Sequence, residues 1–146
     1  MVDKLLVQQR LTLILQYLEK LKNYRAVPRQ DFLGDATIAG AAESYLRRSL
    51  EAIFDVGRHI LAKTGGVDVA AEYKSIARGL GLKRVIGEKL CESLVQMAGY
   101  RNRMVHLYHL INDEEIYFIL QNDLEDIEEF VRQISRYLGT IGSEQV

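Results

Sequence analysis

Apolar residues recur at intervals of three and four along most of the chain, which is the spacing of one helical face. The first such segment covers residues 3–24 and places Leu11, Ile14 and Leu18 on one stripe. The second follows Asp35, a residue suited to cap a helix N-terminus, and extends to about residue 63. Both segments are therefore predicted to be long amphipathic helices.

The rest of the chain continues the helical pattern. A shorter helix is expected over residues 69–78, a fourth begins near residue 83, and a fifth covers residues 114–138. Proline occurs only at position 28, so few positions interrupt a helix. Four long helices and one short helix with short connections predict an all-α, up-and-down bundle that forms a single domain over residues 1–146.

Composition is that of an ordinary globular chain, with 48% apolar and 27% charged residues. The net charge of -1 conceals an asymmetry, because residues 1–103 hold 17 Lys or Arg against 11 Asp or Glu. Residues 104–131 hold eight acidic residues and no basic one. This pattern fits a basic body that attracts a polyanion to one face, and it fits equally well with acidic residues that are merely solvated near a helix start.

Cys91 is the only cysteine, so no disulfide can form within the chain. The N-terminus lacks the apolar run of a signal peptide, and no stretch approaches 18 uninterrupted apolar residues. These features predict a cytoplasmic protein that does not span a membrane.

The segment with the clearest chemical potential combines an arginine, a histidine and a tyrosine. It reads Arg101-Asn102-Arg103-Met104-Val105-His106-Leu107-Tyr108. A guanidinium binds a phosphate, and an imidazole transfers protons near neutral pH. The combination suits chemistry on a phosphodiester.

On a continuous helix, Arg101 and Tyr108 would share a face, and Asn102 would lie one turn before His106. Arg101 and His106 would diverge by about 140°. They could flank a groove, converge where the helix loosens near His106, or need a second chain. Asn102 could orient the imidazole or donate to phosphate. The alternative is a structural cluster in which the arginine pairs with acidic residues of the last helix.

Asp55 is a supporting candidate, because it precedes His59 by four residues on one helical face. The pair could hold a metal or steer a base, but a structural hydrogen bond is the simpler interpretation, with Asp55 at the border of the cleft. No cysteine pair, His-Glu-x-x-His motif or carboxylate cluster suggests a metal site. No cofactor or metal is therefore expected.

The motif resembles that of the HEPN superfamily, whose ribonucleases carry Arg, four to six residues, then His. The ending His106-Leu107-Tyr108 is similar to the HepT subgroup, in which the motif closes as His-x-Tyr. Residues 50–61 resemble that family's second helix, and residues 97–106 resemble its signature segment. The likeness covers about residues 5–138.

The resemblance implies an all-helical, HEPN-type bundle that forms a two-fold dimer and cleaves RNA without a metal. Arg101 and His106 would be the catalytic pair. The chain would be the toxin of a toxin–antitoxin module, and its partner an MntA-type nucleotidyltransferase that transfers AMP to Tyr108. The added AMP would put negative charge where the RNA phosphate binds. The alternative is a non-catalytic HEPN binding module that partners a minimal nucleotidyltransferase.

Overall fold

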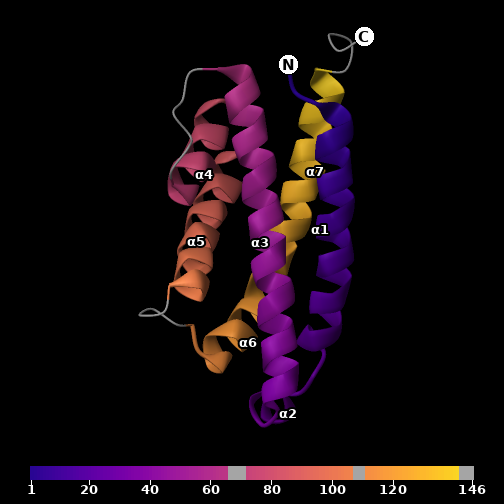
Figure 1. Ribbon diagram of the computed structural model, residues 1–146, viewed down its shortest axis with the longest axis vertical. Helices are drawn as coiled ribbons and strands as arrows, with labels where there is room; N and C mark the ends of the chain where they lie inside the picture. Colours follow the sequence, from indigo (N-terminus) through magenta and orange to yellow (C-terminus); the bar gives the residue numbers. More distant parts are fainter. Residues whose placement is uncertain (66–71, 107–110, 142–146) are drawn as a thin grey trace.

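The computed structural model describes residues 1–65, 72–106 and 111–141, and within these ranges the chain forms seven α-helices and no strand (Figure 1). The helices are α1 (Lys4–Arg25), α2 (Arg29–Leu33), α3 (Ala36–Thr64), α4 (Tyr73–Leu82), α5 (Glu88–Val105), α6 (Asp113–Asn122) and α7 (Leu124–Thr140). The predicted all-α fold is confirmed. None of the described helices is long and apolar enough to cross a membrane.

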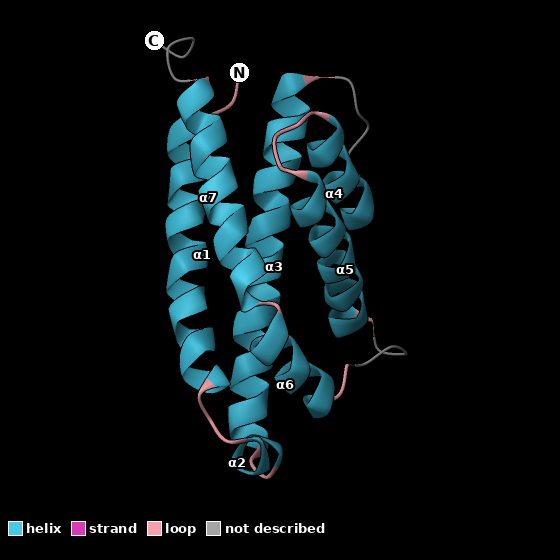
Figure 2. Cartoon of the chain, turned by 180° about the vertical axis from the view of Figure 1, so that it is seen from behind, coloured by secondary structure: helices cyan, strands magenta, loops and turns pink. Residues whose placement is uncertain are grey.

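Helix α3 is the centre of the bundle. Helices α1 and α7 pack together on one side of it, and the pair α4 and α5 packs on the other side (Figures 1 and 2). Helix α6 lies between α5 and the end of the bundle that α2 closes. Helix α5 contacts both α3 and α4, and these two helices also contact each other. Together they position α5.

Side-chain caps explain where α1 and α3 begin. Asp3 accepts a hydrogen bond from the N–H of Leu6 at 3.1 Å, which satisfies a free donor of the first turn of α1. Asp35 caps α3 in the same way and is 2.9 Å from the N–H of Thr37. The predicted role of Asp35 is therefore confirmed.

Helices α3 and α4 approach closely at Gly57. A Cβ atom at this position would lie 2.6 Å from Cγ2 of Ile76 and 3.0 Å from Cδ1 of Leu80. Both α4 side chains are buried. The absence of a side chain at Gly57 thus allows α4 to pack directly on α3, as a glycine within an apolar stripe suggests.

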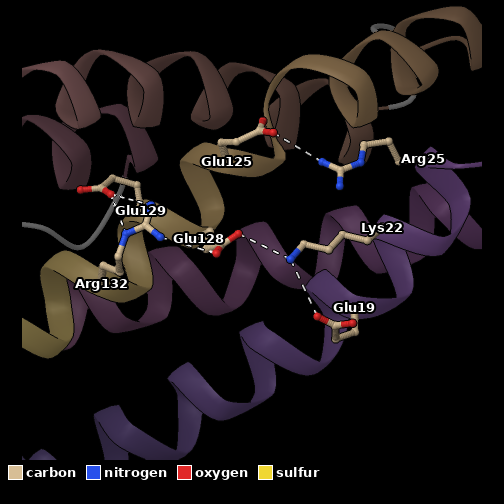
Figure 3. Close-up of polar contacts among 7 residues, drawn as sticks. All are labelled: Glu19, Lys22, Arg25, Glu125, Glu128, Glu129 and Arg132. Atoms are coloured by element: carbon tan, nitrogen blue, oxygen red, sulfur yellow. Dashed lines mark hydrogen bonds and ion pairs between the residues drawn. The ribbon is translucent and has the colours of Figure 1, made fainter.

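Ion pairs neutralise much of the acidic C-terminal part of the chain (Figure 3). Lys22 and Arg25 of α1 pair with Glu128 and Glu125 of α7, each at 3.5 Å. Arg132 also contacts Glu128 within α7. These pairs are partly exposed and each contributes little to stability. The two pairs with Lys22 and Arg25 connect the acidic segment to α1.

Three predicted helix boundaries were wrong. The short helix is α4, which begins at Tyr73, and residues 66–71 lie outside the described part of the chain. The next helix begins at Glu88 because a turn follows α4, with Arg84 at a positive φ of 60°. The last predicted helix is divided at Asp123, which ends α6 and begins α7, so the described bundle has more helices than expected.

Candidate functional site

Helix α5 carries the predicted catalytic arginine and ends just before the predicted catalytic histidine. Its last residue is Val105, and His106 has the extended angles φ -94° and ψ 122°. The N–H of His106 still donates to the carbonyl of Asn102 at 3.1 Å, which fixes the histidine backbone to the last helical turn. The helix therefore ends before His106, where one of the alternatives considered had it loosen, and Tyr108 lies outside the described residues.

The guanidinium of Arg101 lies over an aromatic ring. Its guanidinium carbon is 4.1 Å from the centre of the Tyr73 ring, which is within the range of a cation–π contact. Its Nε atom is buried and makes no hydrogen bond. No ion pair to Arg101 occurs among residues 1–65, 72–106 and 111–141. The side chain is thus held in place by an uncharged group, and no carboxylate in this part of the chain neutralises it.

Tyr73 connects the arginine to helix α3. It is the first residue of α4, and its ring packs on the buried ring of Phe54 with a centroid separation of 5.0 Å. A second guanidinium, that of Arg58, lies 5.5 Å from the same Tyr73 ring. Sequence reasoning did not identify Tyr73 as part of the site. In the sequence, Tyr73 is only an aromatic residue near the start of a short helix. The sequence does not show which other helix its ring contacts.

Asp55 pairs with an unexpected partner. Its carboxylate lies 3.3 Å from Nη1 of Arg58, while Nε2 of His59 accepts a hydrogen bond from the N–H of Asp3 at 3.0 Å. The expected contact between Asp55 and His59 is therefore absent from the described residues. Asp55 instead reaches the site through Arg58, which shares the Tyr73 ring with Arg101.

Asp55 also borders a pocket of about 340 Å³ between α1 and α3, which Arg10, Arg58 and His59 line as well. Burial and the nearby Lys63 ammonium lower the pKa of His59. The described residues contain no group of three or more His, Cys, Asp or Glu side chains arranged to hold a metal ion.

His106 is exposed, and its imidazole makes no hydrogen bond or ion pair with the described residues. Asn102, which supplies the carbonyl for the His106 N–H, is partly buried. The backbone contact places His106 directly after the last helical turn of α5. The chain thus offers an accessible proton-transfer group next to the end of α5.

Arg103 is the arginine that pairs with an acidic residue. Its Nη1 and Nη2 atoms donate to the two carboxylate oxygens of Glu115 at 2.6 and 2.8 Å. These hydrogen bonds lower the pKa of Glu115 and raise that of Arg103. The structural alternative considered for the motif therefore applies to Arg103. Arg101 has no such contact among the described residues.

A larger pocket, of about 830 Å³, lies at the opposite end of α5. The turn after α4, the first turns of α5 and the end of α7 line it, with Arg78, Cys91 and Arg136 among the residues. It includes none of the predicted site residues. Pocket size alone would therefore direct attention away from the motif.

Comparisons with known proteins agree with the motif and the fold. The family profile described as "Ribonuclease HepT-like" matches residues 14–134. A tRNA nuclease HepT from Aphanizomenon flos-aquae is 27% identical over 143 residues, which covers 98% of this chain and 97% of the relative. An mRNA nuclease HepT from Shewanella oneidensis is 28% identical over 100 residues, covering 68% and 74% of the two chains.

The fold also matches solved structures. A tri-AMPylated HEPN toxin from Shewanella oneidensis, solved in complex with its MNT antitoxin, has a TM-score of 0.78 at 24% identity. The match covers 89% of this chain and 96% of the toxin. The HEPN-type fold predicted from the sequence is thereby confirmed. Since the family profile spans most of the chain and the fold agrees with it, the chain belongs to the HepT-like ribonuclease family.

Proposed function

We propose that this chain is an endoribonuclease in which Arg101 and His106 act on the scissile phosphate. The observation that carries the proposal is the state of Arg101. Its guanidinium is fixed against the Tyr73 ring, no described carboxylate pairs with it, and the exposed His106 follows five positions later. The names of two relatives, a tRNA nuclease and an mRNA nuclease, support the same class of substrate.

The proposed reaction is attack of a ribose 2′-oxygen on the adjacent phosphorus. The O2′–P bond forms as the P–O5′ bond breaks, which gives a 2′,3′-cyclic phosphate and a 5′-hydroxyl. A base removes the 2′-proton and an acid supplies a proton to the leaving O5′. Arg101 stabilises the charge that builds on the non-bridging oxygens, for which its forked N–H groups are suited. Asn102 donates to the phosphate or orients the imidazole.

Assembly completes the site in this proposal. One chain offers a single strong candidate for proton transfer, His106, whereas the reaction needs a base and an acid. A two-fold dimer would bring a second His106 to the same cleft. The dimer is thus part of the proposed mechanism.

We also propose that the chain acts in the cytoplasm as the toxin of a toxin–antitoxin pair. The partner would be an MntA-type nucleotidyltransferase that transfers AMP to Tyr108. The solved AMPylated HEPN toxin with its MNT antitoxin supports this assignment. An AMP group on Tyr108, two residues after His106 in the sequence, would add a negative charge that opposes binding of the RNA phosphate.

The proposal is tested by measuring cleavage of purified RNA by the wild-type chain and by the Arg101→Ala and His106→Ala variants. Each substitution is expected to lower the cleavage rate by about 100-fold or more. Arg48→Ala is the matched control, because Arg48 also lies over a tyrosine, at 5.8 Å from the centre of the Tyr45 ring, but belongs to α3 and not to the motif. Undiminished cleavage by His106→Ala would refute the assignment. An inactive wild type that still accepts AMP on Tyr108 would favour the binding module.

A further inference from the structure

We propose that Tyr73 is the positioning residue for Arg101, and that its ring holds the guanidinium ready for an RNA phosphate without neutralising it. The inference rests on the proposed function of Arg101 and assigns a role to a residue outside the Arg-His-Tyr motif. Tyr73 acts through Arg101 and has no contact with the reacting atoms in this proposal.

The Tyr73 ring is itself fixed in place. Its packing on Phe54, at 5.0 Å between ring centres and an interplanar angle of 53°, ties it to the buried centre of α3. Helix α4 cannot shift easily, since Ile76 and Leu80 fill the space above Gly57. The ring that contacts Arg101 is therefore part of the rigid junction between α3 and α4.

Two guanidiniums lie over this ring, and only one of them has a carboxylate partner among the described residues. Arg58 is 5.5 Å from the ring centre and is paired with Asp55 at 3.3 Å. Arg101 is closer, at 4.1 Å, and has no carboxylate partner among the described residues. The local positive charge that remains available to an anion is thus concentrated on Arg101.

An aromatic partner suits this task better than a carboxylate. A carboxylate would orient the guanidinium through the same N–H groups that a phosphate needs, and the two anions would compete. A ring attracts the guanidinium through its face and leaves the in-plane N–H donors free. Because the Nε atom of Arg101 is buried and unpaired, the terminal nitrogens are the donors that bind the phosphate.

Tyr73→Leu removes the ring, Tyr73→Met does so with an unbranched and more adaptable side chain of similar volume, and Tyr73→Phe keeps the ring. The readouts are cleavage of RNA and affinity for a 2′-O-methylated RNA, which lacks the attacking hydroxyl and cannot be cut. Tyr73→Leu and Tyr73→Met are expected to weaken affinity by about 5- to 30-fold, the range that loss of a partly buried cation–π contact of about 1–2 kcal/mol implies. Tyr73→Phe should stay close to wild type.

Tyr117→Leu is the matched structural control. Tyr117 packs on the buried Phe32 with ring centres 5.2 Å apart and an angle of 57°, which is nearly the geometry of Tyr73 on Phe54. Its loss should lower the melting temperature by an amount similar to that of Tyr73→Leu and leave RNA affinity unchanged.

A double-mutant cycle separates the two proposals. In an Arg101→Ala background, Tyr73→Leu should have no further effect on affinity, because its role passes through Arg101. The Tyr73 proposal is overturned if both ring-removing variants bind RNA like wild type, or if Tyr73→Leu weakens the Arg101→Ala protein by the same factor. If Arg101→Ala alone binds and cleaves like wild type, the proposed function of Arg101 fails, and the role of Tyr73 fails with it.

Discussion

Arg103 and Glu115 join the end of α5 to the first turn of α6 through two parallel hydrogen bonds of 2.6 and 2.8 Å. Glu115 is further held by its own N–H, which donates to the Asn112 side chain at 2.8 Å. In the sequence, Arg103 and Glu115 stand on either side of Tyr108. Two arginines that stand two positions apart therefore have different environments, one paired with an acid and one stacked on a ring.

This division predicts opposite results for two identical substitutions. Arg101→Lys keeps the charge but loses the flat stacking surface and the forked donors, so RNA cleavage should fall by about 10-fold or more. Arg103→Lys can still pair with Glu115 and should cleave at nearly the wild-type rate, with a slightly lower melting temperature. Steady-state cleavage and thermal unfolding of both variants check the prediction. Equal losses of activity would show that the two arginines share one role.

The contact between α3 and α4 at Gly57 predicts a loss of stability when a methyl group is added. Gly57→Ala should lower the free energy of unfolding by about 1–3 kcal/mol, because Ile76 and Leu80 must move away. Gly40→Ala, in the same helix but with no atom within 4 Å of the new Cβ, should instead raise it by about 0.5–1 kcal/mol. Urea denaturation measures both. A stable Gly57→Ala variant would show that α4 is not closely packed there.

His59 predicts a pH dependence of stability. Burial and the Lys63 charge lower its pKa, and its Nε2 accepts the Asp3 N–H only when that nitrogen is unprotonated. The unfolded chain therefore binds more protons in mild acid. The contribution of His59 is complete above the ordinary value of 6.5 and is lost as the pH falls from there towards the lowered pKa of the folded state.

The measurement is the free energy of unfolding at several pH values from about 7.5 to 5, for wild type and His59→Gln. Wild type should lose stability more steeply in this range than the variant. His106 and His109 are unchanged in both proteins, so their contributions cancel. Identical slopes would contradict the assigned environment of His59.

Tyr108 is predicted to be the site at which a partner nucleotidyltransferase adds AMP. Incubation with the partner and ATP, followed by peptide mass spectrometry, should find AMP on Tyr108, and the modified protein should no longer cleave RNA. Tyr108→Phe should escape both modification and inactivation, while Tyr100→Phe, on the partly buried face of α5, should be modified like wild type. AMP on another residue, with Tyr108 unmodified, would contradict the prediction.

Local signals predicted much of the fold. Asp35 was recognisable as a cap because its side chain acts on its own backbone neighbourhood, and Gly57 stood out because it interrupts an apolar stripe. The break at Asp123 had no such signal. Leu120, Leu124 and Ile127 continue the helical spacing through it, so the pattern predicts one helix where the structure has α6 and α7.

The site was less predictable, because it depends on which helices meet. From Asp55, partners three and four residues later are equally accessible on a helix, and the structure pairs it with Arg58 and not with His59. The contact between Tyr73 and Arg101 joins α4 to α5 across 28 positions of sequence, and no periodicity records it. The end of α5 at Val105 was among the alternatives, but the residues of the motif are also compatible with a continuous helix, so the sequence did not decide between them.

The most direct test of the central claim is the chemistry of the cut ends. Wild-type protein and His106→Ala are incubated with RNA in buffer that contains EDTA, and the products are analysed for terminal phosphates. Wild type should give 2′,3′-cyclic phosphates and 5′-hydroxyls, and His106→Ala should leave the RNA intact. Cleavage by His106→Ala with the same ends and at the same rate would contradict the account.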